Sequence, residues 1–400
     1  MFLFNLTANS HGGGCELGGG VGRKGQGARG EKGGGGWKTG GRGERRETGG
    51  IEERGDIPAL AGAENVVICQ EMNKLENRRV TVTGGAGFVG ANLVERLLAQ
   101  GNEVTCLDDF STGMRENIAE FLGNPRFRLV EGDIRDPKAC AAAVEGAEVV
   151  LHEAALGSVP GSIADPVRAE EVNVGGFVKM LWASKQAGVR RFVYAASSAA
   201  YGDDERLPKV EEQIGKPLSP YATTKVADEW FARNFSDLYG METVGLRYFN
   251  VFGRKQDPHG AYAAVIPLFA KALLEGRSPV INGDGRATRD YTHVDNVVSA
   301  NELAATTENP AALNEVYNVG CGERTDLLEL VALLKEALLG AGVDARGVRA
   351  VHGPERPGDI VHSVADISKA RRLLGYEPSV GVREGLAATA AWYAATLGGG

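Results

Sequence analysis

Cysteine, long apolar runs and an excess of positive charge are all lacking in this chain of 400 residues. The five cysteines are scattered without a C-x-x-C pair, which argues against a disulfide framework or a zinc site and predicts a reducing, cytoplasmic location. No apolar run approaches the ~18 residues that a membrane span needs. The formal net charge of −8 gives no reason to expect a nucleic-acid partner. The expectation is therefore a protein with no metal, membrane or nucleic-acid ligand.

The beginning of the chain has little that could form a core. Residues 1–50 hold 19 of the 57 glycines, and apolar residues there are sparse and show no period. Such a segment cannot bury enough surface to offset the entropy of ordering it. We predict that residues 1–75 are a disordered tail or a non-native extension, with Met72 as a candidate start.

Downstream, short apolar runs alternate with stretches of helical periodicity. The runs are Val80–Thr83, Glu103–Leu107, Arg126–Val130, Val149–Leu151, Arg191–Ala195 and Glu242–Arg247. Strands that alternate with helices indicate an α/β, Rossmann-like fold with a doubly wound parallel sheet. Beyond residue 250 the rhythm is less regular. We therefore predict a larger domain over 76–250 and a smaller C-terminal domain over 251–400, with 316–319 as a candidate strand that returns to the main sheet.

A glycine loop with the spacing G-x-x-G-x-x-G follows the first predicted strand. Gly84 permits a tight turn, Gly87 lets the backbone approach a pyrophosphate, and Gly90 lets helix and strand pack closely. The N-terminus of the next helix, with Phe88 and Val89 in its first turn, then faces the phosphates. The loop predicts a dinucleotide site.

Acidic residues at the ends of the next two strands indicate which dinucleotide is bound. Asp108 ends the second strand, where a carboxylate can accept hydrogen bonds from both ribose hydroxyls of NAD and would repel the 2′-phosphate of NADP. Asp133 and Ile134 follow the third strand and are candidates to hold the adenine. The predicted cofactor is NAD.

Tyr221 and Lys225 are four residues apart, so on a helix they share one face. A phenol with its ordinary pKa of about 10 is a poor base at neutral pH, and a nearby cation lowers the pKa of an acid by roughly 1–3 units. Solvated tyrosine–lysine pairs on helix surfaces are common, so the pair alone is a weak pattern. Beside a dinucleotide loop, it predicts a centre that transfers protons.

With these residues in hand, the chain resembles the extended short-chain dehydrogenase/reductase family over about residues 78–396, and within it the NAD-dependent nucleotide-sugar 4-epimerases. The motifs that carry the resemblance are Thr83–Gly90, Gly132–Ile134, His152–Ala155, Ser197–Gly202, Ser219–Tyr221, Leu246–Gly253, Gly283–Gly285, Arg289–Tyr291 and Arg356–Asp359. The stretches Ala154–Pro160 and Gly260–Pro267 are most similar to bacterial UDP-N-acetylglucosamine 4-epimerases of surface-polysaccharide pathways.

The resemblance implies a role for each matching residue. Tyr221 would take the proton of the sugar 4-hydroxyl, Lys225 would hold the nicotinamide ribose, and Ser197 would bridge substrate and tyrosine. NAD would accept a hydride from C4 and return it to the other face of the 4-keto sugar. The implied cofactor residues are Gly84, Gly87, Phe88, Val89, Gly90, Asp108, Asp133, Ile134, Ala154, Ala155, Asn173, Tyr221 and Lys225. The implied substrate residues are Ser197, Ser198, Asn250, Arg289, Arg356, Asp359 and Ser363.

The resemblance also implies an NAD-binding domain over 76–250, a nucleotide-sugar domain over 251–400 and a homodimer. Met180, Trp182 and helix 222–235 are candidates for the dimer seam. Ser363 matches a position beside the sugar C2 substituent, and a serine there leaves room for an N-acetyl group. We therefore expect UDP-N-acetylglucosamine or UDP-N-acetylgalactosamine as the substrate, with their uronic acid forms as further candidates.

Three alternatives stay open. The first is a UDP-glucose 4-epimerase that acts on plain hexoses. The second is a nucleotide-sugar dehydratase or decarboxylase, but related dehydratases place an Asp-Glu pair where this chain has Ser198 and Ala199. The third is an NAD-binding regulator without activity, but such proteins typically lose the tyrosine or the lysine.

Overall fold

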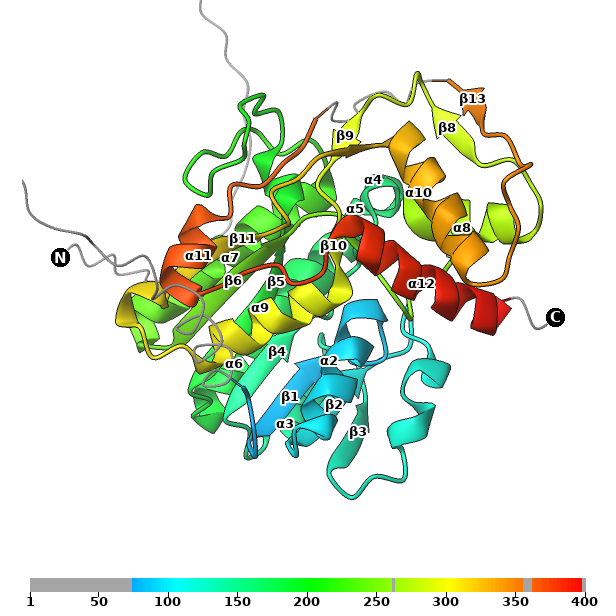
Figure 1. Cartoon of the computed structure of the whole chain (residues 1–400). Coiled ribbons are helices and arrows are strands. Elements are labelled where there is room, and N and C mark those ends of the chain that lie inside the picture. Colours follow the sequence, from blue (N-terminus) through cyan, green and yellow to red (C-terminus); the bar gives the residue numbers. More distant parts are fainter. Residues whose placement is uncertain (1–73, 261–262, 355–361, 398–400) are drawn as a thin grey trace, which may run out of the picture. The chain divides into compact units, whose positions relative to one another are not determined.

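A computed structural model of the chain describes residues 74–260, 263–354 and 362–397. Of the predicted tail, residues 1–73 lie outside this part. The central feature is a seven-stranded, wholly parallel sheet in the order β11-β6-β5-β4-β1-β2-β3 (Figure 1). Its strands are β1 (Arg79–Thr83), β2 (Glu103–Asp108), β3 (Phe127–Glu131), β4 (Val149–His152), β5 (Arg191–Ser197), β6 (Glu242–Tyr248) and β11 (Glu315–Val319). The predicted Rossmann-like fold is confirmed.

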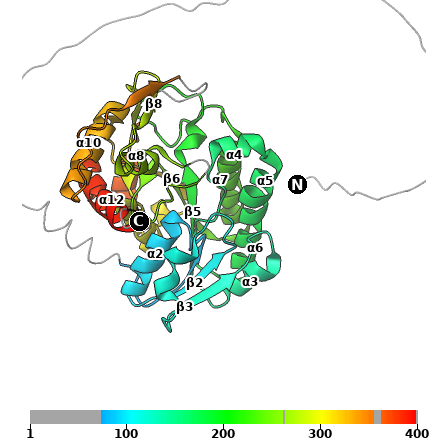
Figure 2. The ribbon, with the colours of Figure 1, turned by 90° about the vertical axis from the view of Figure 1, so that its right-hand side faces the viewer.

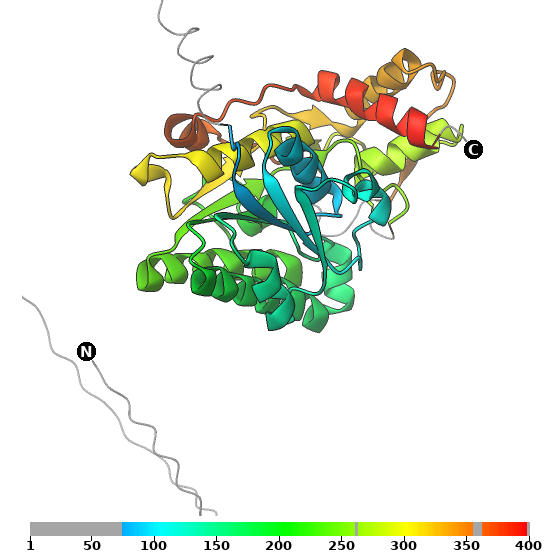
Figure 3. The same cartoon turned by 90° about the horizontal axis from the view of Figure 1, so that it is seen from below.

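Helices cover both faces of this sheet, as the view along the layers shows (Figure 3). One face carries α2 (Phe88–Ala99), α9 (Val294–Thr306) and α11 (Ser368–Leu374), and their apolar residues share a core with β1, β2, β5 and β6. The other face carries α3 (Pro137–Val144), α6 (Phe177–Ala187) and α7 (Pro220–Tyr239), which form a second core. The strands are thus buried on both sides, which explains their near-continuous apolar sequence.

Helix α7 positions the Tyr221–Lys225 pair, and its sequence fixes where it begins and ends. Ser219 is the N-cap, and its side chain accepts a hydrogen bond from the backbone N–H of Ala222 at 3.1 Å. Pro220 follows in the first turn, where its missing N–H costs nothing. Gly240 ends the helix in the left-handed conformation, with φ of 67°.

A smaller group of elements forms its own core beside the carboxyl ends of the main strands (Figure 2). Its helices are α8 (Val265–Leu274), α10 (Leu327–Gly340) and α12 (Val382–Leu397). Its short strands pair as β8 (Val280–Asn282) with β13 (Val351–Gly353), β9 (Thr288–Arg289) with β12 (Thr325–Asp326), and β7 (Val251–Phe252) with β10 (Thr292–His293). Minor helices are α4 (Val159–Ala164), α5 (Pro166–Glu170), the π-helical η3 (Glu171–Gly176), and the short 3-10 segments η1 (Arg115–Asn117), η2 (Ala119–Phe121), η4 (Ser198–Tyr201) and η5 (Pro310–Ala312).

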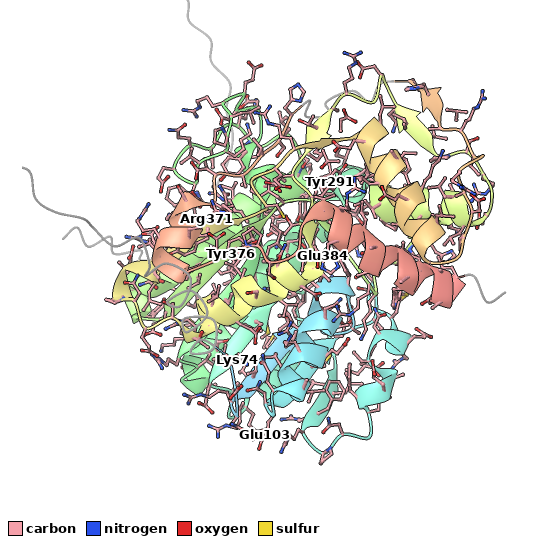
Figure 4. The ribbon with its side chains drawn as sticks, viewed as in Figure 1. Lys74, Glu103, Tyr291, Arg371, Tyr376 and Glu384 are labelled. Atoms are coloured by element: carbon pink, nitrogen blue, oxygen red, sulfur yellow. The ribbon has the colours of Figure 1, made fainter. Side chains whose placement is uncertain are left out.

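The chain after residue 250 contributes to both cores. Helix α9, strand β11 and helix α11 pack with the large sheet, while α8, α10 and α12 form the smaller core. Tyr376, which follows the Gly375 cap of α11 and is labelled in Figure 4, is fully buried in the large core and donates a hydrogen bond to the carbonyl of Gly320 at 3.0 Å. Tyr291, labelled in the same figure, belongs to the smaller core. The division into domains at residue 250 stays a prediction.

Candidate active site

A cavity of about 650 Å³ lies at the carboxyl ends of the main strands. Strand β1 stands between β2 and β4 in the sheet, so the strand order reverses direction there. The loops that follow β1 and β4 leave on opposite sides of such a point, and this is where doubly wound sheets bind ligands. The cavity is lined by residues from the ends of β1, β2, β3, β4, β5 and β6, and also by residues after β7.

The glycine loop has the geometry that a dinucleotide needs. Gly84 has φ of 65°, and a Cβ there would lie 2.8 Å from the backbone nitrogen of Ala154. A Cβ on Gly90 would lie 2.1 Å from the Gly84 carbonyl oxygen. Gly87 caps α2 without a side-chain acceptor, so the N–H groups of the first turn are available to an anion. The residues present therefore fit the pyrophosphate of NAD.

The predicted acids occupy different settings. Asp108 lines the cavity, is almost fully buried, and accepts hydrogen bonds from the backbone N–H groups of Ala86 and Phe110, both at 2.9 Å. Burial raises the pKa of Asp108 above its ordinary value, and those two hydrogen bonds oppose the rise. Asp133 also lines the cavity, but its carboxylate pairs with Arg135 at 2.6 Å, and this pairing lowers its pKa.

Tyr221 and Lys225 both line the cavity from the first two turns of α7. The Lys225 ammonium is buried and donates hydrogen bonds to the carbonyl of Ala195 at 2.9 Å and to Asp228 at 3.3 Å. Ser197, at the end of β5, accepts a hydrogen bond from the backbone N–H of Ala199 at 3.1 Å, so its hydroxyl proton can be donated elsewhere. Three groups able to bind or move protons thus border one cavity.

The predicted substrate residues line the same cavity as far as the structure describes them. Asn250 has φ of 29° and donates a hydrogen bond to the Asp290 carbonyl at 3.0 Å, which fixes its side chain. Arg289 reaches the cavity from β9. Ser363 also lines the cavity, is buried for most of its surface, and donates its backbone N–H to the carbonyl of Thr288 at 3.1 Å. Ser198 also lines the cavity. Arg356 and Asp359 lie outside the described residues.

Of the predicted cofactor residues, Gly84, Gly87, Phe88, Val89, Gly90, Asp108, Asp133, Ile134, Ala154, Ala155, Tyr221 and Lys225 line the cavity. Asn173 is placed differently. It is buried behind the cavity wall, where its side chain exchanges two hydrogen bonds with the backbone of Leu156 and donates one to Thr224. Asn173 therefore braces the turn after β4 and does not itself line the cavity.

Sequence reasoning assigned no role to several polar residues that line the cavity, among them Glu153, Tyr248 and Lys255. Tyr248 donates a hydrogen bond to Glu153 at 2.8 Å, and burial raises the pKa of Glu153 to about 8, which favours the protonated carboxyl. The Lys255 ammonium lies 3.0 Å from the Glu95 carboxylate and donates a hydrogen bond to the Asn117 carbonyl at 3.1 Å. Glu153 directly follows β4 and Tyr248 ends β6, so their position at carboxyl ends of strands was the available signal.

Comparison with known proteins identifies the family. The model of the NAD dependent epimerase/dehydratase family matches residues 80–320. The chain belongs to this family. A UDP-glucose 4-epimerase of Mycolicibacterium smegmatis is 40% identical over 317 residues, which cover 79% of this chain and 98% of that protein. The cofactor of this NAD-dependent epimerase/dehydratase family member is NAD.

Two solved structures of relatives match the fold closely. A UDP-N-acetylglucosamine 4-epimerase from Methanobrevibacter ruminantium, in complex with UDP-N-acetylmuramic acid, has a TM-score of 0.73 and 36% identity over 80% of this chain and 99% of that one. A dTDP-glucose 4,6-dehydratase from Streptomyces venezuelae, with NAD bound, has a TM-score of 0.72 and 34% identity over 80% of this chain and 98% of that one. Both 4-epimerases and dehydratases are thus among the similar proteins of the epimerase/dehydratase family.

Membrane-spanning helices and metal-binding clusters are both absent from the described residues of this epimerase/dehydratase family member. No described helix is both long enough and apolar enough to cross a membrane. Across residues 74–260, 263–354 and 362–397, no group of three or more histidine, cysteine, aspartate or glutamate side chains is placed to hold a metal ion.

Proposed function

We propose that this enzyme inverts C4 of a UDP-hexose, with UDP-N-acetylglucosamine and UDP-N-acetylgalactosamine as the preferred pair. The observation that carries the proposal is the convergence of Ser197, Tyr221 and Lys225 on the cavity that contains the glycine loop. The relatives named as UDP-sugar 4-epimerases, in sequence and in structure, support the same reaction.

The three residues divide the chemistry between them. Tyr221 accepts the proton of the sugar 4-hydroxyl, and the charge of Lys225 stabilises the phenolate that this requires. Ser197 donates its hydroxyl proton to the same sugar oxygen and holds it in line. Bound in this cavity, NAD would supply reversible hydride-transfer chemistry at C4, so that the overall reaction involves no net oxidation. Tyr221 returns its proton to the C4 oxygen, which completes the alcohol at the inverted carbon.

The residues after β5 favour epimerisation over dehydration. Elimination across C5 and C6 needs an acid beside C6, and dehydratases of related sequence carry an Asp-Glu pair there. Ser198 and Ala199 occupy those positions here, and both line the cavity. Neither is a Brønsted acid of suitable strength. Glu153 is the nearby carboxyl to consider, but it comes from β4 and is held by Tyr248.

Ser363 supports an N-acetylated substrate. Its side chain is small and borders the cavity, and its backbone is fixed by the hydrogen bond to Thr288. A bulky residue at this position would take up the space that an acetamido group needs. Arg289, which also borders the cavity, supplies a planar donor fork that suits a diphosphate.

We also propose a homodimer that forms through α6 and α7. Trp182, Trp230, Leu238 and Tyr239 on these helices are 45–72% exposed, and the rings of Trp182 and Tyr239 are in edge contact with centroids 6.0 Å apart. A cluster of large exposed apolar side chains on a folded protein commonly marks an interface. Met180, expected at the seam, is fully buried in the core under α6 and cannot contribute to it.

The test is product analysis with a panel of UDP-sugars, with and without added NAD. The panel pairs N-acetylated, plain and uronic acid hexoses, and the products are identified by chromatography and proton NMR. The proposal predicts a mixture of C4 epimers, fastest for the acetylated pair. A 4-keto-6-deoxy product would show a dehydratase, and no conversion of any sugar would favour an NAD-binding regulator.

A further inference from the structure

Asp228 is a buried carboxyl beside the proposed catalytic lysine that the mechanism above does not use. It lies three residues after Lys225 on α7 and is fully buried, with Oδ2 3.3 Å from the Lys225 ammonium. Within the described residues, its other oxygen is buried and meets no hydrogen-bond donor. Such a carboxyl is costly to bury unless an ionic partner compensates it. Lys225 is that partner.

Lys225 is also a charged group that is buried and needs a charge of the opposite sign. Its side chain is 3% exposed, and the carbonyl of Ala195 is a dipole that cannot balance a full charge. Burial by itself lowers the pKa of Lys225, but Asp228 above all, then Tyr221 and Glu153, raise it above the ordinary value. Asp228 is thus the main reason why the buried amine keeps its proton.

We propose that Asp228 is the counter-ion that keeps Lys225 charged and in place at neutral and alkaline pH. Asp228 is a positioning residue, because it acts on the cofactor and on Tyr221 through Lys225. The inference rests on the role proposed for Lys225 above, and it adds a residue that controls that role.

The other titratable groups around the pair do not replace Asp228. Glu229, on the same helix, forms two hydrogen bonds with Arg247 of β6 at 2.7 and 2.8 Å. His152, at the end of β4, has its pKa lowered to about 3 by burial and by Lys225, so it is neutral. Burial, Glu229 and Asp228 raise the pKa of Tyr194 on β5 well above its ordinary value, so its phenol stays protonated.

Glu153 is the remaining acid, and it comes from the turn after β4. Burial raises the pKa of Glu153 to about 8, which favours its protonated form, and Tyr248 donates a hydrogen bond to it at 2.8 Å. Asp228 is therefore the carboxyl that contacts the Lys225 ammonium directly, at 3.3 Å, and among the described residues this ammonium forms no other ion pair.

The pair makes a definite prediction about pH. Burial raises the pKa of Asp228 above its ordinary value, and Lys225 limits that rise. As the pH falls through this raised pKa, Asp228 takes up a proton, so the wild type then resembles an Asp228→Asn variant. Above it the wild-type pair is ionic, whereas the variant leaves Lys225 without this counter-charge. The two proteins should therefore agree in acid and separate as the pH rises.

The experiment is an NMR titration of the Lys225 side chain in the NAD holoenzyme, with isotope-labelled lysine and the signal assigned by its loss in Lys225→Arg. We expect the Lys225 midpoint in Asp228→Asn to fall by about one unit or more. Turnover of the variant should decline with the same midpoint on the alkaline side. Asp228→Glu, which keeps a carboxylate, should restore the wild-type behaviour. Asp228→Ser should repeat the Asn result if Asn does not fold.

The matched control is Asp237→Asn. Asp237 is on the same helix and pairs with Arg233 at 3.0 Å, but both are more than half exposed. This variant should leave the Lys225 titration unchanged. An unchanged Lys225 midpoint in Asp228→Asn, or a turnover lowered by one constant factor at every pH, would overturn the proposal. The NMR result does not depend on any sugar being converted, so it can be told apart from a failure of the proposed epimerase activity.

Discussion

Single residues in the first two turns of α7 carry the proposed chemistry. Tyr221 is held by the helix start itself, because its backbone N–H donates to the Ser162 hydroxyl at 3.0 Å while Ser219 caps the turn. The Lys225 ammonium is held by the hydrogen bonds that it donates to the Ala195 carbonyl and to the Asp228 carboxylate. A base placed by backbone and buried contacts of this kind needs little rearrangement to meet a substrate.

Replacing Tyr221 by phenylalanine removes the hydroxyl and leaves the ring. We expect turnover to fall by about 10²- to 10⁴-fold, the usual contribution of a positioned general base, while NAD stays bound. Steady-state rates and the NAD content after gel filtration measure the two effects. Tyr239→Phe, at the exposed end of the same helix, is the control. Near-normal turnover of the Tyr221 variant would remove Tyr221 from the role of base.

Ser363→Tyr tests the proposed room for an acetamido group. We expect the variant to lose roughly tenfold or more of kcat/KM on N-acetylated UDP-hexoses and to retain its activity on plain ones, because the phenol fills the space beside C2. The measurement is kcat/KM of the variant and the wild type on N-acetylated and on plain UDP-hexoses. An equal loss on both classes, or no loss on either, would refute the gate.

At the scale of elements, the β1–α2 turn is the most tightly constrained part of the site. A Cβ on residue 90 would lie only 2.1 Å from the Gly84 carbonyl oxygen, so the backbone would have to move to make room for this atom. The turn and the helix N-terminus would separate as a result.

Gly90→Ala should therefore weaken NAD binding by at least about tenfold and lower the melting temperature. A calorimetric titration with NAD and a thermal melt measure these effects. Gly123→Ala is the matched control, since a Cβ there meets nothing within 4 Å. If the Gly90 variant bound NAD as tightly as the control does, the close packing of residue 90 against the Gly84 carbonyl would not be needed for cofactor binding.

Local sequence patterns predicted the main strands within one or two residues of their ends, but they could not show long-range placement. The third strand begins at Phe127 and not at Arg126, and β5 continues to Ser197. Two features depended on contacts between distant segments: the attachment of Asn173 to Leu156, and the Tyr248–Glu153 hydrogen bond. Neither contact leaves a period or a spacing in the sequence, because its two partners lie on different elements of the fold.

At the scale of the whole molecule, the exposed apolar face of α6 and α7 is the feature that the single chain leaves unexplained. Trp230→Glu places a charge on that face, on a side chain that is 66% exposed and so contributes little to the fold. We expect the variant to shift from dimer to monomer in light scattering with its melting curve little changed. Leu328→Glu, on an exposed site of α10, is the control. A wild type that is monomeric at every concentration would contradict the proposed dimer.

The most direct test of the account follows the hydrogen at C4. UDP-N-acetylglucosamine labelled with deuterium at C4 is incubated with the holoenzyme, and the product is analysed by mass spectrometry and NMR. The account predicts the C4 epimer with the deuterium still on C4, because the cofactor takes up and returns the same atom within one site. A product that has lost the label from C4 to solvent, or one that has lost its C6 oxygen, would contradict it.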